Sequence, residues 1–176
     1  MDLVIEGFDA AIGGGIELTS GIVARELARV HVIPVASPDY LAQTARPRKP
    51  SDLEKHKGIV MRSALSGRLR SANLRNRAGE QTTVEMQPRV ILSDPEAITR
   101  AALVGLGIAF VAVPHVLPHL KSGALVRLLP EWHDDIGPLS VYFTARKLMP
   151  AKTRVFVDFV VEQFRRQRLA KKLSAI

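Results

Sequence analysis

The alternation of short apolar runs with capped helical segments predicts an α/β fold for this chain. The most apolar run, residues 108–113, is typical of a strand that is buried on both faces of a parallel sheet. The segment before it has an apolar helical face and ends at Gly105, which can adopt a left-handed cap conformation. A chain of 176 residues that is 47% apolar can bury roughly 70% of the surface exposed by its unfolded form.

Composition excludes several classes of protein. The chain has no cysteine, which excludes a disulfide scaffold, a zinc–thiolate site, an iron–sulfur cluster and a thiol nucleophile. No apolar run approaches the roughly 20 residues of a membrane span, and the start lacks the features of a signal peptide, so we expect a cytoplasmic protein with no membrane partner. The net charge of +8 favours polyanionic partners, but no aromatic residues are interleaved with the basic clusters at residues 62–77 and 165–172. Solvated surface is the preferred interpretation of both clusters.

The first part of the chain predicts a strand, a loop, a second strand and a helix. Residues 3–5 are typical of a buried strand, and Gly13–Gly15 of a flexible turn. Residues 30–35 predict a second strand. Ser37 with Pro38 then predicts the start of a short helix, because Pro suits the first helical position.

The next segment contains a polar stretch between two strands. Ser51–Glu54 has the spacing of a capping box, and residues 59–61 and 89–92 predict buried strands. Residues 62–89 are polar, which predicts an exposed hairpin or meander with a turn at residues 78–80.

A second capping box, Ser93–Glu96, predicts another helix. The apolar face of this helix comprises Ile98, Ala101, Ala102 and Val104. Residues 114–120 then predict a short helix or a turn that Gly123 closes, and strands are expected over 125–129 and 139–143.

The last helix should begin near Pro150 and run past Phe164. Its expected buried stripe comprises Val155, Phe156, Phe159, Val160 and Phe164.

Six segments in this order resemble motifs of LysR-type transcriptional regulators. Residues 2–12 read DLVIEGFDAAI and are similar to the family's DLVxEGFDxAIR; residues 123–130 read GALVRLLP and are similar to its GxLVxLLP. The other four segments are 35–41 (ASPxYL), 50–56 (PxDLxxH), 93–97 with 105–109 (NDxEA and GLGIA) and 154–159 (RxFxDF). Each motif is weak alone, whereas six in one order point to the family's effector-binding domain.

The resemblance implies a two-lobed, periplasmic-binding-protein-like (type 2) fold with an effector in the cleft between the lobes. Residues 1–36 and 137–176 would form lobe I, and residues 37–136 would form lobe II. Lobe I is expected to be incomplete, because the family's first strand and helix have no counterpart here. The winged helix-turn-helix that binds DNA is also expected to be absent from this chain.

Two departures from the family pattern bear on the expected pocket. Gly13 stands where an Arg is common, and residues 68–74 lack a Trp that relatives usually carry.

The candidate effector-binding residues follow predicted strands or begin helices. They are Gly7, Phe8, Asp9, Arg62, Ser63, Ser93, Asp94, Phe110 and Val111. Ligands of open α/β sheets gather at the carboxyl ends of strands, and a helix start attracts anions, so an acidic aromatic compound or a small carboxylate is the expected effector. Each residue also has a purely structural interpretation: capping for Ser93 and Asp94, a tight turn with a core aromatic for Gly7–Asp9, and solvent exposure for Arg62 and Ser63. The core is preferred for Phe110 and Val111.

No catalytic constellation stands out. His115 and His119 have the four-residue spacing of metal ligands, but no Glu lies between them and Pro114 and Pro118 disturb the helix. His31, His56 and His133 have no evident partners in the sequence. Neither a nucleophile elbow nor a phosphate loop is present, so we expect no enzyme, no cofactor and no metal.

The expected function is therefore effector sensing and oligomerisation within a LysR-type regulator, as a homodimer or homotetramer. DNA would be bound only through the absent N-terminal domain. The main alternative is a stand-alone small-molecule binding protein of the same fold with no DNA role. A non-specific nucleic-acid binder would rest on charge alone. The effector, the target genes and the choice between activation and repression are not set by the sequence.

Overall fold

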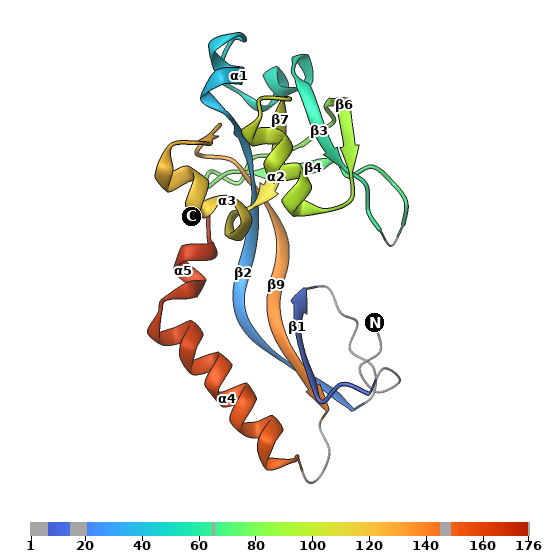
Figure 1. The fold of residues 1–176 in the computed structure, drawn as a ribbon, viewed down its shortest axis with the longest axis vertical. Helices are drawn as coiled ribbons and strands as arrows, with labels where there is room; N and C mark the ends of the chain where they lie inside the picture. The colour runs from blue at the N-terminus through green and yellow to red at the C-terminus, as the bar shows by residue number, and fades with distance from the viewer. Residues whose placement is uncertain (1–6, 15–20, 65, 145–148, 176) are drawn as a thin grey trace. The chain divides into compact units, whose positions relative to one another are not determined.

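A computed structural model describes residues 7–14, 21–64, 66–144 and 149–175 (Figure 1). The chain divides into two compact units. Unit 1 comprises residues 1–30, 136–174 and 176, and unit 2 comprises residues 31–135 with Ala175. The predicted strand over residues 3–5 lies outside the described residues, as does Gly15.

Strands and helices alternate along unit 2. In chain order it contains the end of β2 (Ile22–Ala36), α1 (Pro38–Ala42), the 3-10 helix η1 (Pro50–Lys55), β3 (Lys57–Met61), β4 (Ala72–Arg75), β5 (Gln81–Val84), β6 (Gln87–Leu92), α2 (Pro95–Leu103), β7 (Ile108–Ala112), α3 (Val113–Ser122), β8 (Val126–Arg127) and the start of β9 (His133–Thr144). Unit 1 contains β1 (Ala10–Gly14), the remainder of β2 and β9, α4 (Ala151–Arg166) and α5 (Leu169–Leu173).

The sheet is mixed, with the strand order β5-β4-β9-β2-β7-β3-β6. Strand β3 pairs in parallel with both β6 and β7, whereas β7 pairs antiparallel with β2. Helix α2 connects the parallel strands β6 and β7, which is the βαβ pattern that the alternation of elements predicted. The α/β fold class is confirmed.

Strand β7 shows why its sequence is apolar throughout. Ala109 and Val111 belong to one hydrophobic core of unit 2, together with residues of α2 and α3. Ile108 belongs to the other core, and the half-buried Phe110 packs against it. Because successive side chains of a strand point to opposite faces, a strand between two cores needs apolar residues at every position.

The polar stretch forms the predicted hairpin. Strands β4 and β5 are antiparallel, and Gly79 in the turn between them has a φ of +87°, which a residue without a Cβ adopts readily. One face of the hairpin is buried, since Leu74 is fully buried and Val84 is only 2% exposed. These two side chains are the apolar anchors in a stretch that was expected to be exposed.

The start of α1 was predicted correctly, and the start of the next helix was not. The Ser37 hydroxyl accepts a hydrogen bond from the Tyr40 amide at 3.2 Å. Ser51 does not act as a cap, because the turn of η1 begins before it, at Pro50. The Asp52 carboxylate instead accepts hydrogen bonds from the backbone amides of Arg48 and Lys49, at 3.0 and 3.2 Å.

Two residues of the predicted core are exposed. Ile91 of β6 is 40% exposed, and β6 is the last strand in the sheet order, with a neighbouring strand on one side. Val104 is 74% exposed, because α2 ends at Leu103 and the positive φ of Gly105 turns the chain away from the helix.

The core of unit 1 lies between its strands and α4. Leu27 of β2 and Val141 of β9 are buried there with Val157 and Val160 of α4. Strand β1 pairs antiparallel with β9, and it includes Gly13 and Gly14, which were expected to form a flexible turn.

The predicted buried stripe of α4 is largely wrong. Val155, Phe156 and Phe159 are 67%, 44% and 60% exposed, whereas Val157 is 3% exposed. The buried face repeats every three or four residues from Thr153 through Val157 to Val160. The described residues of unit 1 cover only part of the neighbouring face, which carries the two phenylalanines.

Candidate functional site

The carboxyl ends of three parallel strands define the candidate site in unit 2. Strands β3, β6 and β7 end at Met61, Leu92 and Ala112, and their parallel pairing places these ends at one edge of the sheet. Helices α2 and α3 begin directly after β6 and β7, so their N-termini belong to the same edge. This is where ligands of open α/β sheets are held.

Arg62 and Ser63 leave β3 at this edge. The Arg62 amide donates to the Leu92 carbonyl at 2.8 Å, which joins the segment after β3 to the end of β6. The Arg62 guanidinium donates to the Gly67 carbonyl at 2.9 Å, and the Ser63 hydroxyl accepts from the Ser66 amide at 3.2 Å. Both side chains therefore hold the loop after β3, and the remaining donors of the exposed guanidinium stay available for an anion.

Ser93 and Asp94 connect β6 to α2. Asp94 is the N-cap, and its carboxylate accepts a hydrogen bond from the Ala97 amide at 2.7 Å. The predicted capping box between Ser93 and Glu96 is therefore wrong by one residue, and Glu96 pairs with Arg100 at 3.2 Å instead. Ser93 is exposed, and its hydroxyl makes no hydrogen bond with the described part of the chain.

Phe110 and Val111 lie in β7 and face opposite sides of the sheet. Val111 is 2% exposed and belongs to the core between the sheet and helices α2 and α3. Phe110 is half-buried against the other core. Both side chains pack against hydrophobic cores, which is the interpretation preferred from the sequence.

Gly7, Phe8 and Asp9 belong to unit 1. Gly7 has a φ of +73° and Phe8 is 51% exposed, so this is a turn that presents its aromatic side chain to solvent. Asp9 forms an ion pair with Lys152 at 2.7 Å beside a small hollow of about 290 Å³.

Three histidines that lacked partners in the sequence have them in the structure. His56 accepts or donates a hydrogen bond with the Tyr40 hydroxyl at 3.1 Å. The rings of His31 and His133 lie 4.5 Å apart, and the Ala175 amide donates to His31 Nδ1 at 2.9 Å. Burial, followed by the neighbouring His31, lowers the pKa of His133.

Asp134 lies beside the hairpin of unit 2. It accepts a hydrogen bond from the Asn73 amide at 3.3 Å, and burial raises the pKa of its carboxyl group. Neither Asp134 nor the histidine pair forms a three-ligand cluster, and the described ranges contain no group of three or more His, Asp or Glu side chains suited to a metal ion.

Comparison with known proteins identifies the family. Residues 1–165 match the LysR substrate binding domain, and the chain belongs to this family. The chain is 30% identical to the HTH-type transcriptional activator AaeR of Escherichia coli, over 93% of this chain and 52% of the relative. It is 29% identical to an HTH-type transcriptional repressor of Pseudomonas aeruginosa, over 93% of this chain and 51% of that protein. The chain thus spans about half the length of the curated relatives it matches.

Solved structures agree with this assignment. The regulatory domain of CrgA from Neisseria meningitidis superimposes with a TM-score of 0.75 at 26% identity, covering 92% of this chain and 78% of that one. Full-length AphB of Vibrio cholerae, a virulence activator, gives a TM-score of 0.78 at 26% identity, covering 92% of this chain and 54% of that one. These are LysR-type regulatory domains, which have the two-lobed periplasmic-binding-protein-like fold expected from the motifs. The curated relatives named above are transcriptional regulators. No described helix combines the length and the apolar character needed to cross a membrane.

Proposed function

We propose that this chain is the effector-sensing and oligomerising domain of a cytoplasmic LysR-type regulator, and that it has no catalytic role. The observation that carries the proposal is the family match over residues 1–165, combined with an exposed polar edge where two helices begin. In the whole protein, a winged helix-turn-helix outside this chain would bind DNA. Effector binding would shift the population of two arrangements of the lobes, and so change how paired DNA-binding domains are spaced.

The proposed effector is a small anion, such as a carboxylate. The N-terminus of α2 carries the positive end of a helix dipole, and the exposed Ser93 hydroxyl and Arg62 guanidinium lie at the same edge of the sheet. Phe8, Gly7 and Asp9 are included in the proposed site on the resemblance to the family. The two lobes are proposed to be residues 1–36 with 137–176, and residues 37–136.

The test is binding of a panel of small aromatic and aliphatic carboxylates, measured by calorimetry on the unmodified chain and on single variants. Ser93→Ala and Phe8→Ala should each weaken binding of the best ligand several-fold while the far-ultraviolet circular dichroism spectrum is retained. Ser122→Ala is the matched control, because this exposed serine ends α3, whereas the site lies where α3 begins. Unchanged affinity in both site variants would contradict the assignment.

Oligomerisation is tested separately, by the mass of the particle in solution. A homodimer or homotetramer supports the proposal, and a monomer at all concentrations contradicts this part of it.

A further inference from the structure

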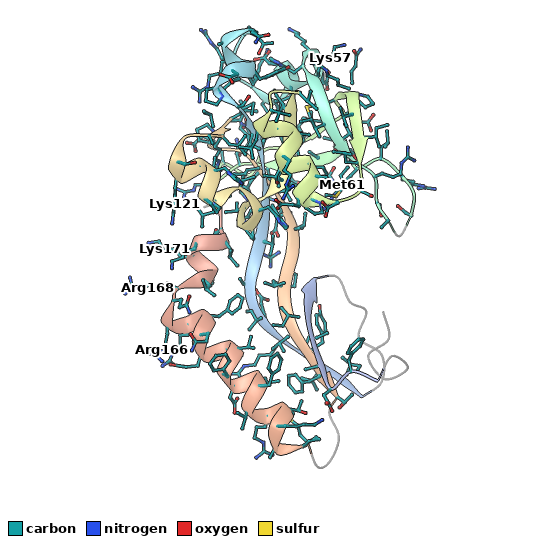
Figure 2. All side chains as sticks on the ribbon, viewed as in Figure 1. Lys57, Met61, Lys121, Arg166, Arg168 and Lys171 are labelled. Carbon is teal, nitrogen blue, oxygen red and sulfur yellow. The ribbon has the colours of Figure 1, made fainter. Side chains whose placement is uncertain are left out.

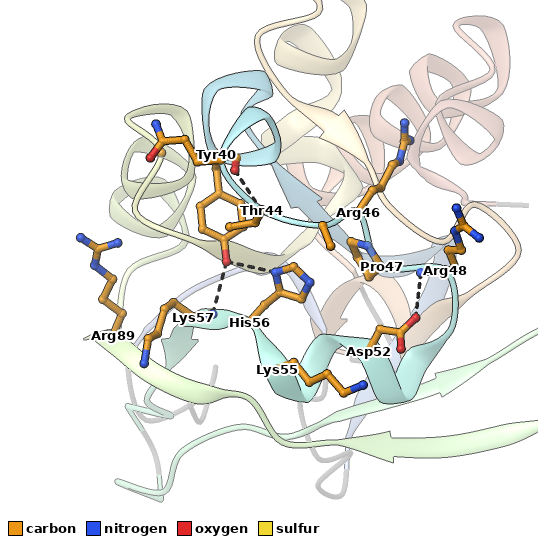
Figure 3. A pocket seen from close by; sticks show the side chains of 13 residues that line it. Tyr40, Thr44, Arg46, Pro47, Arg48, Asp52, Lys55, His56, Lys57 and Arg89 are labelled. Carbon is orange, nitrogen blue, oxygen red and sulfur yellow. Dashed lines mark hydrogen bonds between the residues drawn. The ribbon is translucent and has the colours of Figure 1, made fainter.

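A second hollow lies in unit 2, at the opposite edge of the sheet from the candidate effector site. Its volume is about 670 Å³, within the range typical of small-molecule sites (Figure 3). It is lined by the end of α1 and the loop after it, by η1, and by the first half of β3 and β6. The polar and charged residues of the lining include Tyr40, Arg46, Arg48, Lys55, His56, Lys57 and Arg89.

The two ends of β3 separate this hollow from the effector edge. Lys57, which lines the hollow, is the first residue of β3, and Met61 is the last. Figure 2 labels these two residues at opposite ends of the strand. Gly105, which also lines the hollow, precedes β7, so the hollow lies on the amino side of the parallel strands.

The lining carries a large excess of positive charge. The lining includes five cationic residues and one carboxylate, that of Asp52. The Arg46 guanidinium also donates to the Arg127 carbonyl at 3.5 Å. Among the described residues, none of the five cations forms an ion pair. The hydrogen bonds from the Arg48 and Lys49 amides commit the Asp52 carboxylate to its own loop. The Arg48 amide, followed more weakly by that of Lys49 and by nearby lysines, lowers the pKa of Asp52 against the opposing effect of desolvation.

One wall of the hollow has a fixed hydrogen-bond pattern (Figure 3). The Lys57 amide donates to the Tyr40 hydroxyl oxygen at 3.3 Å, and the same hydroxyl lies 3.1 Å from His56 Nδ1. Burial lowers the pKa of His56, an effect that Asp52 opposes, so the imidazole is neutral at pH 7. The Tyr40 hydroxyl and His56 Nδ1 share this hydrogen bond, and which of the two donates is set by the tautomer of the ring.

We propose that this basic hollow binds a second ligand, a small molecule that carries two or more negative charges. The ligand class is a phosphate ester or a di- or tricarboxylate, which share compact, multivalent anionic oxygens. Arginine guanidinium groups bind such oxygens in a bidentate manner, and the lysines add point charge. A multivalent ligand is required because each exposed ion pair contributes little alone, whereas several cations around one ligand act together. This proposal is independent of the effector site at the other edge.

The test is titration of the chain with pyrophosphate and with citrate, by calorimetry at constant ionic strength. Saturable binding of one or both probes is expected, and the stronger probe identifies the phosphate or the carboxylate class. Lys57→Gln and Arg89→Gln should each weaken binding by roughly fivefold, and the double variant should weaken it further. These side chains are exposed, so their replacement is compatible with folding.

Lys121→Gln is the matched control for the loss of one charge. Lys121 is an exposed lysine near the end of α3 and does not line the hollow. Retained affinity in this variant would show that anion binding depends on the residues of the hollow and not on the net charge of the protein. Equal weakening in all variants, or no saturable binding of either probe, would overturn the proposal.

An independent readout is the titration of His56, followed by nuclear magnetic resonance. An anion bound beside the ring stabilises the imidazolium form, so pyrophosphate or citrate should raise the pKa of His56. The ring signals of His115, which lies on α3 outside the hollow, should not change when the probe is added. An unchanged His56 titration at saturating probe would contradict binding at this wall.

Discussion

Two valines in α4 test which face of this helix is buried. Val155 and Val157 are of the same type, lie in the same helix and are two residues apart. Val155 is 67% exposed and Val157 is 3% exposed. Replacing each with alanine removes the same atoms and changes helix propensity by the same amount, so the comparison isolates burial.

The expected magnitudes follow from the exposed fractions. Valine to alanine removes two carbon groups, worth about 1.6 kcal/mol when fully buried at about 0.8 kcal/mol each. Val157→Ala also leaves a cavity, whereas Val155→Ala removes groups that are one-third buried and contribute about 0.5 kcal/mol. The gain in helix propensity is about 0.5 kcal/mol in both variants. Val155→Ala should therefore be close to neutral, and Val157→Ala should lower the free energy of unfolding by about 1.5–2 kcal/mol.

The assay is urea denaturation followed by far-ultraviolet circular dichroism, a signal to which α4 contributes as the longest described helix. The difference between the two variants should be about 1.5 kcal/mol with an unchanged dependence on urea concentration. Equal losses in the two variants, or a larger loss for Val155→Ala, would refute the assignment of the buried face.

Three further predictions concern the N-cap of α2, two buried histidines and the close contact of Gly107 with the backbone of β3. Asp94→Ala should lower the free energy of unfolding by about 1 kcal/mol, because α2 loses its cap, whereas Ser93→Ala should change it by less than about 0.5 kcal/mol; equal losses in urea denaturation would contradict this. The free energy of unfolding should fall as the pH drops below about 6.5, since the unfolded chain binds protons there while His56 and His133, whose pKa values are lowered by burial, stay neutral. A flat profile between about pH 7.5 and 5.5 would argue against buried neutral imidazoles. Gly107→Ala should lower the free energy of unfolding by more than about 2 kcal/mol, because an added Cβ would overlap the backbone of β3 at Lys57. A melting temperature equal to that of the unmodified chain would contradict this prediction.

Local sequence signals predicted most of unit 2, because they agree with its packing. The apolar run of β7 follows from the two cores on either side of it. Gly105 and Gly123 end helices with positive φ values, as expected from residues that lack a Cβ. The candidate edge was also predictable, since Arg62 and Ser93 each follow a strand and the parallel pairing of β3 with β6 brings the strand ends together.

Other features depend on contacts that a local pattern does not encode. Both predicted capping boxes place a serine at the N-cap, whereas the N-cap is Lys49 in η1 and Asp94 in α2, because the proline that follows the N-cap sets where each helix begins. The buried face of α4 is chosen by the strands that pack on it, and the sequence offers two adjacent apolar faces.

The basic hollow was missed for a related reason. Its cations are distributed from Arg46 to Arg89, and the chain brings them together only when η1 and the starts of β3 and β6 assemble. No spacing in the sequence marks such a set.

The division of the chain into a continuous and a discontinuous unit sets the order in which the protein can fold. Unit 2 is built almost wholly from the uninterrupted residues 31–135, whereas unit 1 joins residues before position 31 to residues after position 135. Closing unit 1 across an unfolded segment of that length would carry the full entropic cost of a long loop. Once unit 2 is folded, that segment is compact and the distance between its ends is fixed, so the entropic cost of closing unit 1 falls. During synthesis, the continuous unit can therefore fold while the last helix is still being made, and the two segments of the split unit come together afterwards.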